Sequence, residues 1–456
     1  MRRAIGLCAV ALLVFATAAS AAPGVALVKD IRPGPHGSNP NRLTDTGGTL
    51  FFRAGDGTHG WELWKSDGTG PGTVMVKDIN PGSDGSSPYG LTDVGRTLYF
   101  GADDGAHGGE LWRSDGTHAG TVMVKDIYPG RGWSDPSWLT PVDGILYFTA
   151  GDDELWRSDG TKAGTSLVRD IDPEWDYSDP SWLTPVDDIL YFTANDGEHG
   201  DELWRSDGTR AGTVMVKDIN PGPDGSQPYE LTDVGGTLYL VAYDDTHGWE
   251  LWKSDGTDVG TVMVKDIWPG SDSSDYGPYD LTDVGATLYF DAEDGTHGHE
   301  LWRSDGTEAG TVIVKDINPG PDGSGPNELT DVDGLLYFRA YESTHGPELW
   351  MSDGTEAGTG LVKDIYPGPG PFIHFWDKAW LTPVDGILYF TVNDGTHGHE
   401  PWRSDGTDTG TVMVSDLYPG EPGSGPAWIT DLGGTVFFSA KRPSTGRELW
   451  SILASP

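Results

Sequence analysis

The stretch Glu110-Leu111-Trp112-Arg113-Ser114-Asp115-Gly116-Thr117 decides the fold, because the chain repeats it from one end to the other. Its tryptophan returns after about 48 residues each time, the period of a repeat architecture. The nine copies of this tryptophan are Trp64, Trp112, Trp156, Trp204, Trp252, Trp302, Trp350, Trp402 and Trp450. A chain of 456 residues would otherwise be expected to form two or three domains. The repeat instead predicts a single domain.

Each repeat contains four short segments that are typical of β-strands. In the second repeat they are residues 91–94, 97–100, 110–112 and 122–127, which are rich in β-branched and aromatic side chains. Asp-Gly turns separate them, because glycine accepts a positive φ and aspartate bonds its own backbone. The chain after the first 21 residues shows no helical period. The expected unit is therefore an all-β, four-stranded sheet.

A four-stranded unit of this length fits one blade of a β-propeller, for which about 40–50 residues is normal. The chain also has a fourth-strand segment at residues 25–31 with no earlier strands before it, and it ends on a third-strand segment, Glu448-Leu449-Trp450. We therefore expect residues 25–31 to complete the last blade and close the ring, which removes the free sheet edges. The prediction is a single β-propeller of about nine blades.

The eight-residue motif resembles a known bacterial group, the ELWxxDGT repeat proteins. The resemblance covers nearly the whole chain after residue 21, and in the eighth copy Pro401 replaces the leucine. It implies exported, propeller-like repeats, and no reaction is attached to it. The resemblance therefore supports the fold and adds little about function.

Residues 1–21 have the pattern of a secretory signal peptide. Arg2 and Arg3 precede an apolar run that is too short to span a bilayer comfortably, and Ala19-Ser20-Ala21 is a small-residue cleavage site. We expect residues 1–21 to be removed, leaving residues 22–456 as the nine-repeat β-propeller domain. Cleavage would also remove Cys8, the only cysteine, so no disulfide is expected. The predicted location is secreted, periplasmic or at the cell surface.

The charge of the chain excludes one class of partner. It carries 71 acidic and 29 basic residues, a formal net charge of −42, and such a surface repels the phosphates of nucleic acids. We see no further apolar segment that would span a membrane. The expected molecule is an acidic monomer that binds neither nucleic acid nor, by a spanning segment, a membrane.

Polar residues that recur in nearly every repeat are expected to build blades. Most basic residues either follow the repeated tryptophan, as Lys65 does, or precede Asp-Ile, as Lys77 does. We expect them to form cross-strand ion pairs inside each blade with residues such as Glu62 and Asp78. The repeated tryptophans are expected to pack between blades.

Histidines and aspartates raise the question of metals. Seven turns carry a His-Gly pair, and we expect each histidine to bond within its own blade, because ligands spread one per blade do not converge on a metal ion. If the first strand is innermost, aspartates such as Asp45 and Asp93 line the central channel and would attract cations. Calcium is the candidate cofactor, since it prefers oxygen ligands, although no Asp-x-Asp-x-Asp-Gly loop is present.

Three loops depart from the repeat, and each adds aromatic residues before a Leu-Thr-Pro-Val segment. Exposed indole rings beside Asp and Ser suit sugars, because the ring face stacks on C–H groups and polar groups bind hydroxyls. The alternative is that these rings fill gaps between blades. The candidate ligand-binding residues are Trp133, Trp138, Trp175, Trp182, Trp376 and Trp380.

The sequence therefore predicts a non-enzymatic binding or interaction propeller that recognises a carbohydrate through these loops. Motifs for a serine nucleophile, a phosphate loop or a zinc protease are missing from the sequence. Two alternatives stay open. The first is a protein-interaction or envelope scaffold without a small ligand, whose partner would be a surface protein. The second is an extracellular glycosidase or lyase that uses paired carboxylates.

Overall fold

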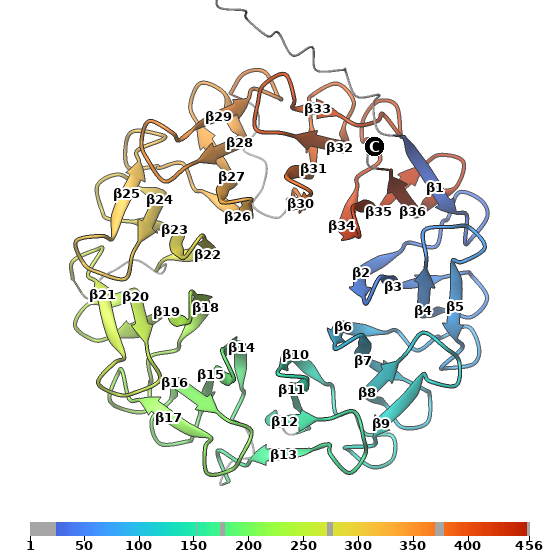
Figure 1. Ribbon diagram of the computed structural model, residues 1–456, viewed down its shortest axis with the longest axis horizontal. Coiled ribbons are helices and arrows are strands. Elements are labelled where there is room, and N and C mark those ends of the chain that lie inside the picture. Colours follow the sequence, from blue (N-terminus) through green and yellow to red (C-terminus); the bar gives the residue numbers. More distant parts are fainter. Residues whose placement is uncertain (1–23, 152, 174–177, 271–276, 370–377, 454–456) are drawn as a thin grey trace, which may run out of the picture.

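The protein is a ring of nine four-stranded antiparallel sheets (Figure 1). The computed structural model describes residues 24–151, 153–173, 178–270, 277–369 and 378–453, and within these ranges it contains strands β1 to β36 and no helix. The prediction of a nine-bladed β-propeller is confirmed. Across the described ranges, no helix is long and apolar enough to cross a membrane.

The first strand of each blade lies at the inside of the ring (Figure 1). In blades one to nine these inner strands are β2 (Asn41–Thr46), β6 (Tyr89–Val94), β10 (Ser137–Val142), β14 (Ser181–Val186), β18 (Tyr229–Val234), β22 (Tyr279–Val284), β26 (Asn327–Val332), β30 (Thr382–Val384) and β34 (Ala427–Leu432). The second strands are β3 (Thr49–Gly55), β7 (Thr97–Asp103), β11 (Ile145–Ala150), β15 (Ile189–Asn195), β19 (Thr237–Asp244), β23 (Thr287–Glu293), β27 (Leu335–Glu342), β31 (Ile387–Asn393) and β35 (Thr435–Arg442).

The third strand of each blade carries the Glu-Leu-Trp motif, and the fourth forms the outer edge. The third strands are β4 (Trp61–Ser66), β8 (Gly109–Ser114), β12 (Glu154–Ser158), β16 (Asp201–Ser206), β20 (Gly248–Ser254), β24 (His299–Ser304), β28 (Gly346–Ser352), β32 (His399–Ser404) and β36 (Gly446–Ile452). The fourth strands are β5 (Val74–Lys77), β9 (Val122–Lys125), β13 (Ser166–Arg169), β17 (Val214–Lys217), β21 (Val262–Lys265), β25 (Val312–Lys315), β29 (Gly360–Lys363), β33 (Val412–Met413) and, in blade nine, β1 (Val25–Lys29).

The ring closes through blade nine, as predicted from the sequence. Its sheet has the strand order β1-β36-β35-β34, so its outer strand comes from the beginning of the chain. Strand β1 runs antiparallel to β36, with Val25 opposite Ile452 and Leu27 opposite Trp450. The backbone N–H of Leu453 also donates a hydrogen bond to the carbonyl oxygen of Gly24 at 3.2 Å.

The apolar core is divided among the blade-to-blade junctions. At the junction between blades one and two, Leu63 and Ile79 of one blade pack in the same cluster as Phe100 and Trp112 of the next. Phe100 is fully buried and Trp112 is 5% exposed. The repeated tryptophan therefore packs between blades, which confirms that prediction.

The repeated glutamate does not form the ion pair that we predicted. The carboxylate of Glu62 accepts hydrogen bonds from the backbone N–H groups of Ile79, Asn80 and Ser86, at 3.2, 3.2 and 2.9 Å, and from the Ser86 hydroxyl at 2.6 Å. Burial raises the pKa of Glu62, and these hydrogen bonds partly offset that effect. The glutamate thus holds the Pro-Gly loop, whose backbone donors fill the place that we had assigned to a lysine.

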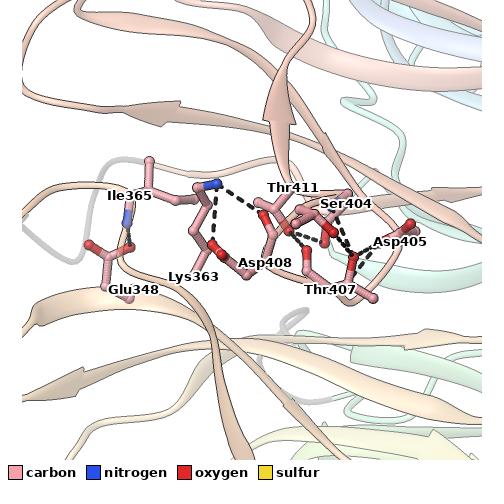
Figure 2. A network of polar contacts seen from close by, with 10 residues as sticks. Glu348, Lys363, Ile365, Ser404, Asp405, Thr407, Asp408 and Thr411 are labelled. Carbon is pink, nitrogen blue, oxygen red and sulfur yellow. Dashed lines mark hydrogen bonds and ion pairs between the residues drawn. The ribbon is translucent and has the colours of Figure 1, made fainter. Parts of the chain in front are cut away.

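The basic residues reach the next blade instead of a partner in their own blade. Lys77 donates to the carbonyl oxygen of Thr121 at 2.9 Å, and its Nζ lies 5.6 Å from the ring centroid of Trp112. Figure 2 shows the corresponding contact of Lys363, which binds Asp408 through the backbone oxygen at 2.9 Å and the carboxylate at 3.3 Å. The prediction of ion pairs inside each blade was therefore wrong. The cations join neighbouring blades.

The turn that receives this lysine is built by its own polar side chains. In blade eight, Asp405 accepts the backbone N–H and the hydroxyl of Thr407, and the hydroxyls of Ser404 and Thr411 lie 2.7 Å apart (Figure 2). The Thr411 hydroxyl also donates to the Thr407 carbonyl oxygen at 2.7 Å. The Ser-Asp-Gly-Thr segment is therefore a structural turn.

Threonines of the inner strands connect the blades around the channel. The hydroxyl of Thr184 donates to the carbonyl oxygen of Leu231 in the next blade at 3.0 Å, and Thr382 donates to Ile429 at 3.2 Å. The aspartate that follows the threonine accepts a backbone N–H of its own turn, as Asp45 does from Gly48 at 2.8 Å. These repeated polar groups are therefore part of the scaffold.

Candidate ligand-binding site

The six predicted tryptophans have different environments. Trp133 and Trp138 are 56% and 45% exposed, whereas Trp182 and Trp380 are half-buried. Trp175 and Trp376 lie outside the described residues. Trp138 and Trp182 face each other across adjacent blades, with ring centroids 5.7 Å apart. The loop of Trp380 leads into β30, on the opposite side of the ring from β10 and β14 (Figure 1).

Three of these residues occupy one structural position, which we call the bulge position: the residue two places before the inner-strand threonine. Most inner strands are bulged here, and the residue adopts a left-handed backbone conformation, with φ of 50° at Trp138 and 56° at Trp380. Bulges redirect a side chain from the face of a sheet. The nine residues at this position are Arg42, Gly90, Trp138, Trp182, Glu230, Asp280, Glu328, Trp380 and Trp428.

The bulge positions bring together a second tryptophan pair that the sequence analysis missed. Trp380 and Trp428, in blades eight and nine, have ring centroids 4.8 Å apart. Trp428 lies in a linking segment of ordinary length, so it did not stand out as a departure from the repeat. Its signal was its alignment: it precedes Thr430 by the same two residues by which Trp380 precedes Thr382.

Acidic residues occupy the bulge positions of blades five to seven, and each carboxylate binds the backbone of the next blade. Glu230 accepts the N–H of Leu281 at 3.2 Å, and Asp280 accepts that of Glu328 at 2.8 Å. Glu328 accepts the N–H of Ala379 at 2.8 Å. Burial raises the pKa of Glu230 and of Asp280. These acids therefore stabilise blade junctions.

A groove of about 650 Å³ opens beside the second tryptophan pair, between blades eight and nine. This volume lies in the range of ordinary small-molecule sites. Its described lining residues are Lys378, Trp380, Thr391, His399, Pro422, Gly423, Ser424, Gly425, Pro426, Ala427, Trp428, Lys441 and Arg447. Aromatic rings and side-chain donors thus line one open space.

Arg447 is held firmly at the wall of this groove. Its Nη1 donates to the carbonyl oxygens of Gly425 and Ser439, at 2.7 and 3.0 Å. Burial lowers the pKa of its guanidinium. The Nζ of Lys378 lies 5.7 Å from the Trp380 ring centroid, and that of Lys441 lies 5.8 Å from the Tyr418 ring centroid. Carbonyl oxygens therefore position Arg447, while the two exposed lysines lie over aromatic rings.

The turn histidines bond within their own blades, as predicted. In blade one, His59 Nδ1 lies 2.7 Å from the carboxylate of Asp56, and this contact raises the pKa of His59. The same contact with an aspartate occurs at His107, His199, His247, His297 and His397, and His345 makes it with Glu342. Among the described residues, no group of three or more His, Cys, Asp or Glu side chains is arranged to hold a metal ion. Calcium binding stays a prediction without an assigned site.

No family model matches the chain, and no curated protein matches it. The resemblance to the ELWxxDGT repeat proteins therefore stays a prediction. The chain is similar in structure to the computationally designed Ika8 protein, with 16% identity, a TM-score of 0.45, and coverage of 81% of this chain and 97% of that chain.

The other similar structures include two peptidases. One is a prolyl endopeptidase, with 12% identity, a TM-score of 0.42, and coverage of 82% of this chain and 55% of the peptidase. The other is oligopeptidase B from Leishmania major, with 12% identity, a TM-score of 0.41, and coverage of 78% of this chain and 52% of the peptidase. The chain thus spans about half the length of these peptidases, and similarity at this level says nothing about its function.

Proposed function

We propose that this protein is an exported, non-enzymatic binding propeller that recognises carbohydrate in the groove between blades eight and nine. The observation that carries the proposal is the pair Trp380–Trp428, whose rings line an open groove of about 650 Å³ together with charged donors. Sugar rings stack their C–H faces on such aromatic surfaces, while donors at the edge bind hydroxyl oxygens.

The chemistry of the described lining favours binding over catalysis. A glycosidase needs two carboxyl groups on either side of the bond that it cleaves. The described residues that line the groove include no carboxylate, and the nearby Glu328 is engaged by the backbone of the next blade. Neither feature supplies an acid–base pair at this place, so a binding role fits the groove better.

The test is a double substitution, Trp380→Leu with Trp428→Leu, in residues 22–456. Leucine keeps apolar volume in the wall and removes the flat ring, so the fold should persist. Two lost stacking contacts predict an affinity for the bound oligosaccharide that is lower by about tenfold or more. A glycan array identifies the ligand, and isothermal titration measures the affinity.

The matched control is the other pair at the same structural position, Trp138→Leu with Trp182→Leu. We expect this variant to bind like the unmodified protein. Retained binding by the Trp380/Trp428 variant, with loss in the control, would move the site to blades three and four. Absence of binding to every glycan would reject the proposal and favour a protein scaffold. Thermal melting of both variants separates loss of binding from loss of fold.

A further inference from the structure

The groove between blades eight and nine differs in charge from the rest of the chain. The molecule has 71 acidic and 29 basic residues, so a random set of lining residues would include more acids than bases. The described lining contains Lys378, Lys441, Arg447 and His399 and no aspartate or glutamate. A recess lined by charges of one sign raises the local concentration of ions of the opposite sign, here anions.

Two of these cations lie directly opposite each other on paired strands. Lys441 of β35 faces Arg447 of β36 in the antiparallel register. Like charges at directly opposed positions destabilise a sheet. The corresponding pairs in blades six and eight are Glu293 with His299 and Asn393 with His399, neither of which joins two permanent cations. Blade nine therefore accepts a repulsion that an anionic ligand would relieve.

Carboxylates act on these cations only from beyond ion-pair distance, as the charge of Lys378 does when it partly offsets the raised pKa of Asp280. Among the described residues, no carboxylate lies within ion-pair distance of Lys378, Lys441 or Arg447, whereas Lys363 has such a partner in Asp408 at 3.3 Å. Arg447 donates to carbonyl oxygens at 2.7 and 3.0 Å, which fix its position without cancelling its charge. A charged donor that is held in advance, as Arg447 is, suits a charged acceptor.

A comparison of blade six with blade eight also shows the loss of an acid beside this groove. In blade six, His299 Nδ1 lies 3.1 Å from the carboxylate of Asp291. In blade eight, the residue aligned with Asp291 is Thr391, whose hydroxyl donates to the carbonyl oxygen of Pro426 at 2.9 Å. An acid that would compensate His399 is thus replaced by a neutral side chain that is already engaged in the scaffold.

We propose that the groove selects anionic oligosaccharides, whose carboxylate or sulfate groups bind Lys378, Lys441 and Arg447 while a sugar ring stacks on Trp380 and Trp428. This inference rests on the proposed carbohydrate function and adds the substrate class. Uronate and sulfate ester share the chemistry that the cations recognise, namely an oxyanion beside a sugar ring.

The experiment compares matched probes by isothermal titration. Oligogalacturonate is compared with its methyl ester, and sulfated dextran oligosaccharide with unmodified dextran oligosaccharide, each at 50 and 300 mM NaCl. We expect one charged probe to bind at least about tenfold more tightly than its neutral partner, with an affinity that falls at the higher salt concentration. The charged probe that binds identifies uronate or sulfate as the source of the anion.

The variant that tests the cations is Lys378→Gln with Lys441→Gln. We expect it to lose about tenfold in affinity for the charged probe and to keep any binding of the neutral one. The control is Lys162→Gln with Arg210→Gln, which makes the same charge change at exposed turns in blades three and four. We expect this control to leave affinity within about twofold of the unmodified protein.

The outcomes separate the two proposals. Equal binding of charged and neutral probes, lost in the Trp380/Trp428 variant, would overturn the anionic selectivity and leave the carbohydrate function standing. Equal loss in the Lys378/Lys441 variant and its control would reduce the effect to overall charge and also overturn the inference. Absence of binding by all four probes and across the glycan array would reject both proposals.

Discussion

The ring is held closed without a covalent link between β1 and β36, so removal of residues 24–31 is the sharpest test of the architecture. The deletion removes strand β1 and leaves β36 as an unpaired edge in blade nine. It also removes Ile31, whose N–H donates to the carboxylate of Glu448 at 3.2 Å. We expect a large loss of stability and association through the exposed edge.

The magnitude follows from the side chains that the strand buries. Val28 and Ile31 are 9% and 7% exposed, and Val25 and Leu27 pack partly buried in the cluster of blade nine. Complete burial of one such side chain contributes about 1.5–3 kcal/mol. Two buried and two half-buried side chains therefore contribute at most about 5–9 kcal/mol. The true value is smaller, because unfolded chains already bury some apolar surface. That is a large share of the stability of a typical domain.

The assay is urea unfolding followed by tryptophan fluorescence, together with size-exclusion chromatography and light scattering. The truncated protein should unfold at a lower urea concentration and should elute partly as oligomers. A synthetic peptide of residues 24–33, added in excess, should restore the monomer by occupying the vacant edge.

A circular permutant supplies the control. Residues 25–33 are moved to the C-terminal side by joining Ile452 to Val25 through a copy of 255–260, which lies between the third and fourth strands of blade five. This chain starts after residue 33 and keeps every contact of β1, so its stability should match that of the unmodified protein. The closure argument would be refuted if the truncated protein stayed monomeric and as stable as the permutant.

Two further predictions concern the buried glutamates. Glu202→Ala removes the acceptor of the N–H groups of Ile219, Asn220 and Ser226, which lie 3.1, 3.2 and 3.0 Å from the carboxylate. The free energy of unfolding in urea should fall by about 3 kcal/mol or more, and by less in Glu202→Gln. Equal losses in the two variants would contradict this role. Burial raises the pKa of Glu202 to about 7 and of Glu250 to about 8, above the ordinary 4.5. From pH 4.5 up to these values the folded state binds more protons than the unfolded state, so the melting temperature should fall from pH 5 to pH 8. A flat or rising profile would contradict this prediction.

Much of the fold could be predicted because blade formation is local. Asp-Gly turns and β-branched segments recur within each repeat, and every strand except β1 pairs with a neighbour in the chain. Closure was predictable for the same reason: residues 25–31 have the pattern of a fourth strand, which had a place only in blade nine. The turn histidines were also local, as the contact between His59 and Asp56 shows.

Contacts between repeats were harder to predict. Lys77 looked like a partner for Glu62 because both recur together, but the acceptor of Lys77 is a backbone oxygen of the next blade and the donors to Glu62 are backbone N–H groups. Backbone donors and acceptors are present at nearly every residue, so the pattern of side chains does not indicate which of them is used. One signal was present: Ser415 replaces the lysine in blade eight, and the next blade has no turn between its third and fourth strands to receive it.

The candidate site was predicted only in part. The sequence pointed to Trp138, Trp182 and Trp380 because their segments depart from the repeat, and Trp428 was missed because its segment does not. The residue at the bulge position has a left-handed backbone, with φ of 58° at Trp428. In most blades no glycine or asparagine marks this conformation in the sequence. The basic residues of the groove come from three strands and one linking segment, so Lys378 and His399 lie far in the chain from Lys441 and Arg447.

The lysine contact between blades has a consequence for how the ring arose. Because the donor lies on one side of a blade and the acceptor turn on the other, a repeat is complementary to a copy of itself. A duplicated gene segment that encodes one whole blade therefore arrives with both interfaces already matched. Segments 134–148 and 178–192 are nearly identical, as such a duplication would leave them. The number of blades can thus change by whole units during evolution. Only the junction of blade eight with the closing blade nine, where Ser415 stands in place of lysine, must stay unique.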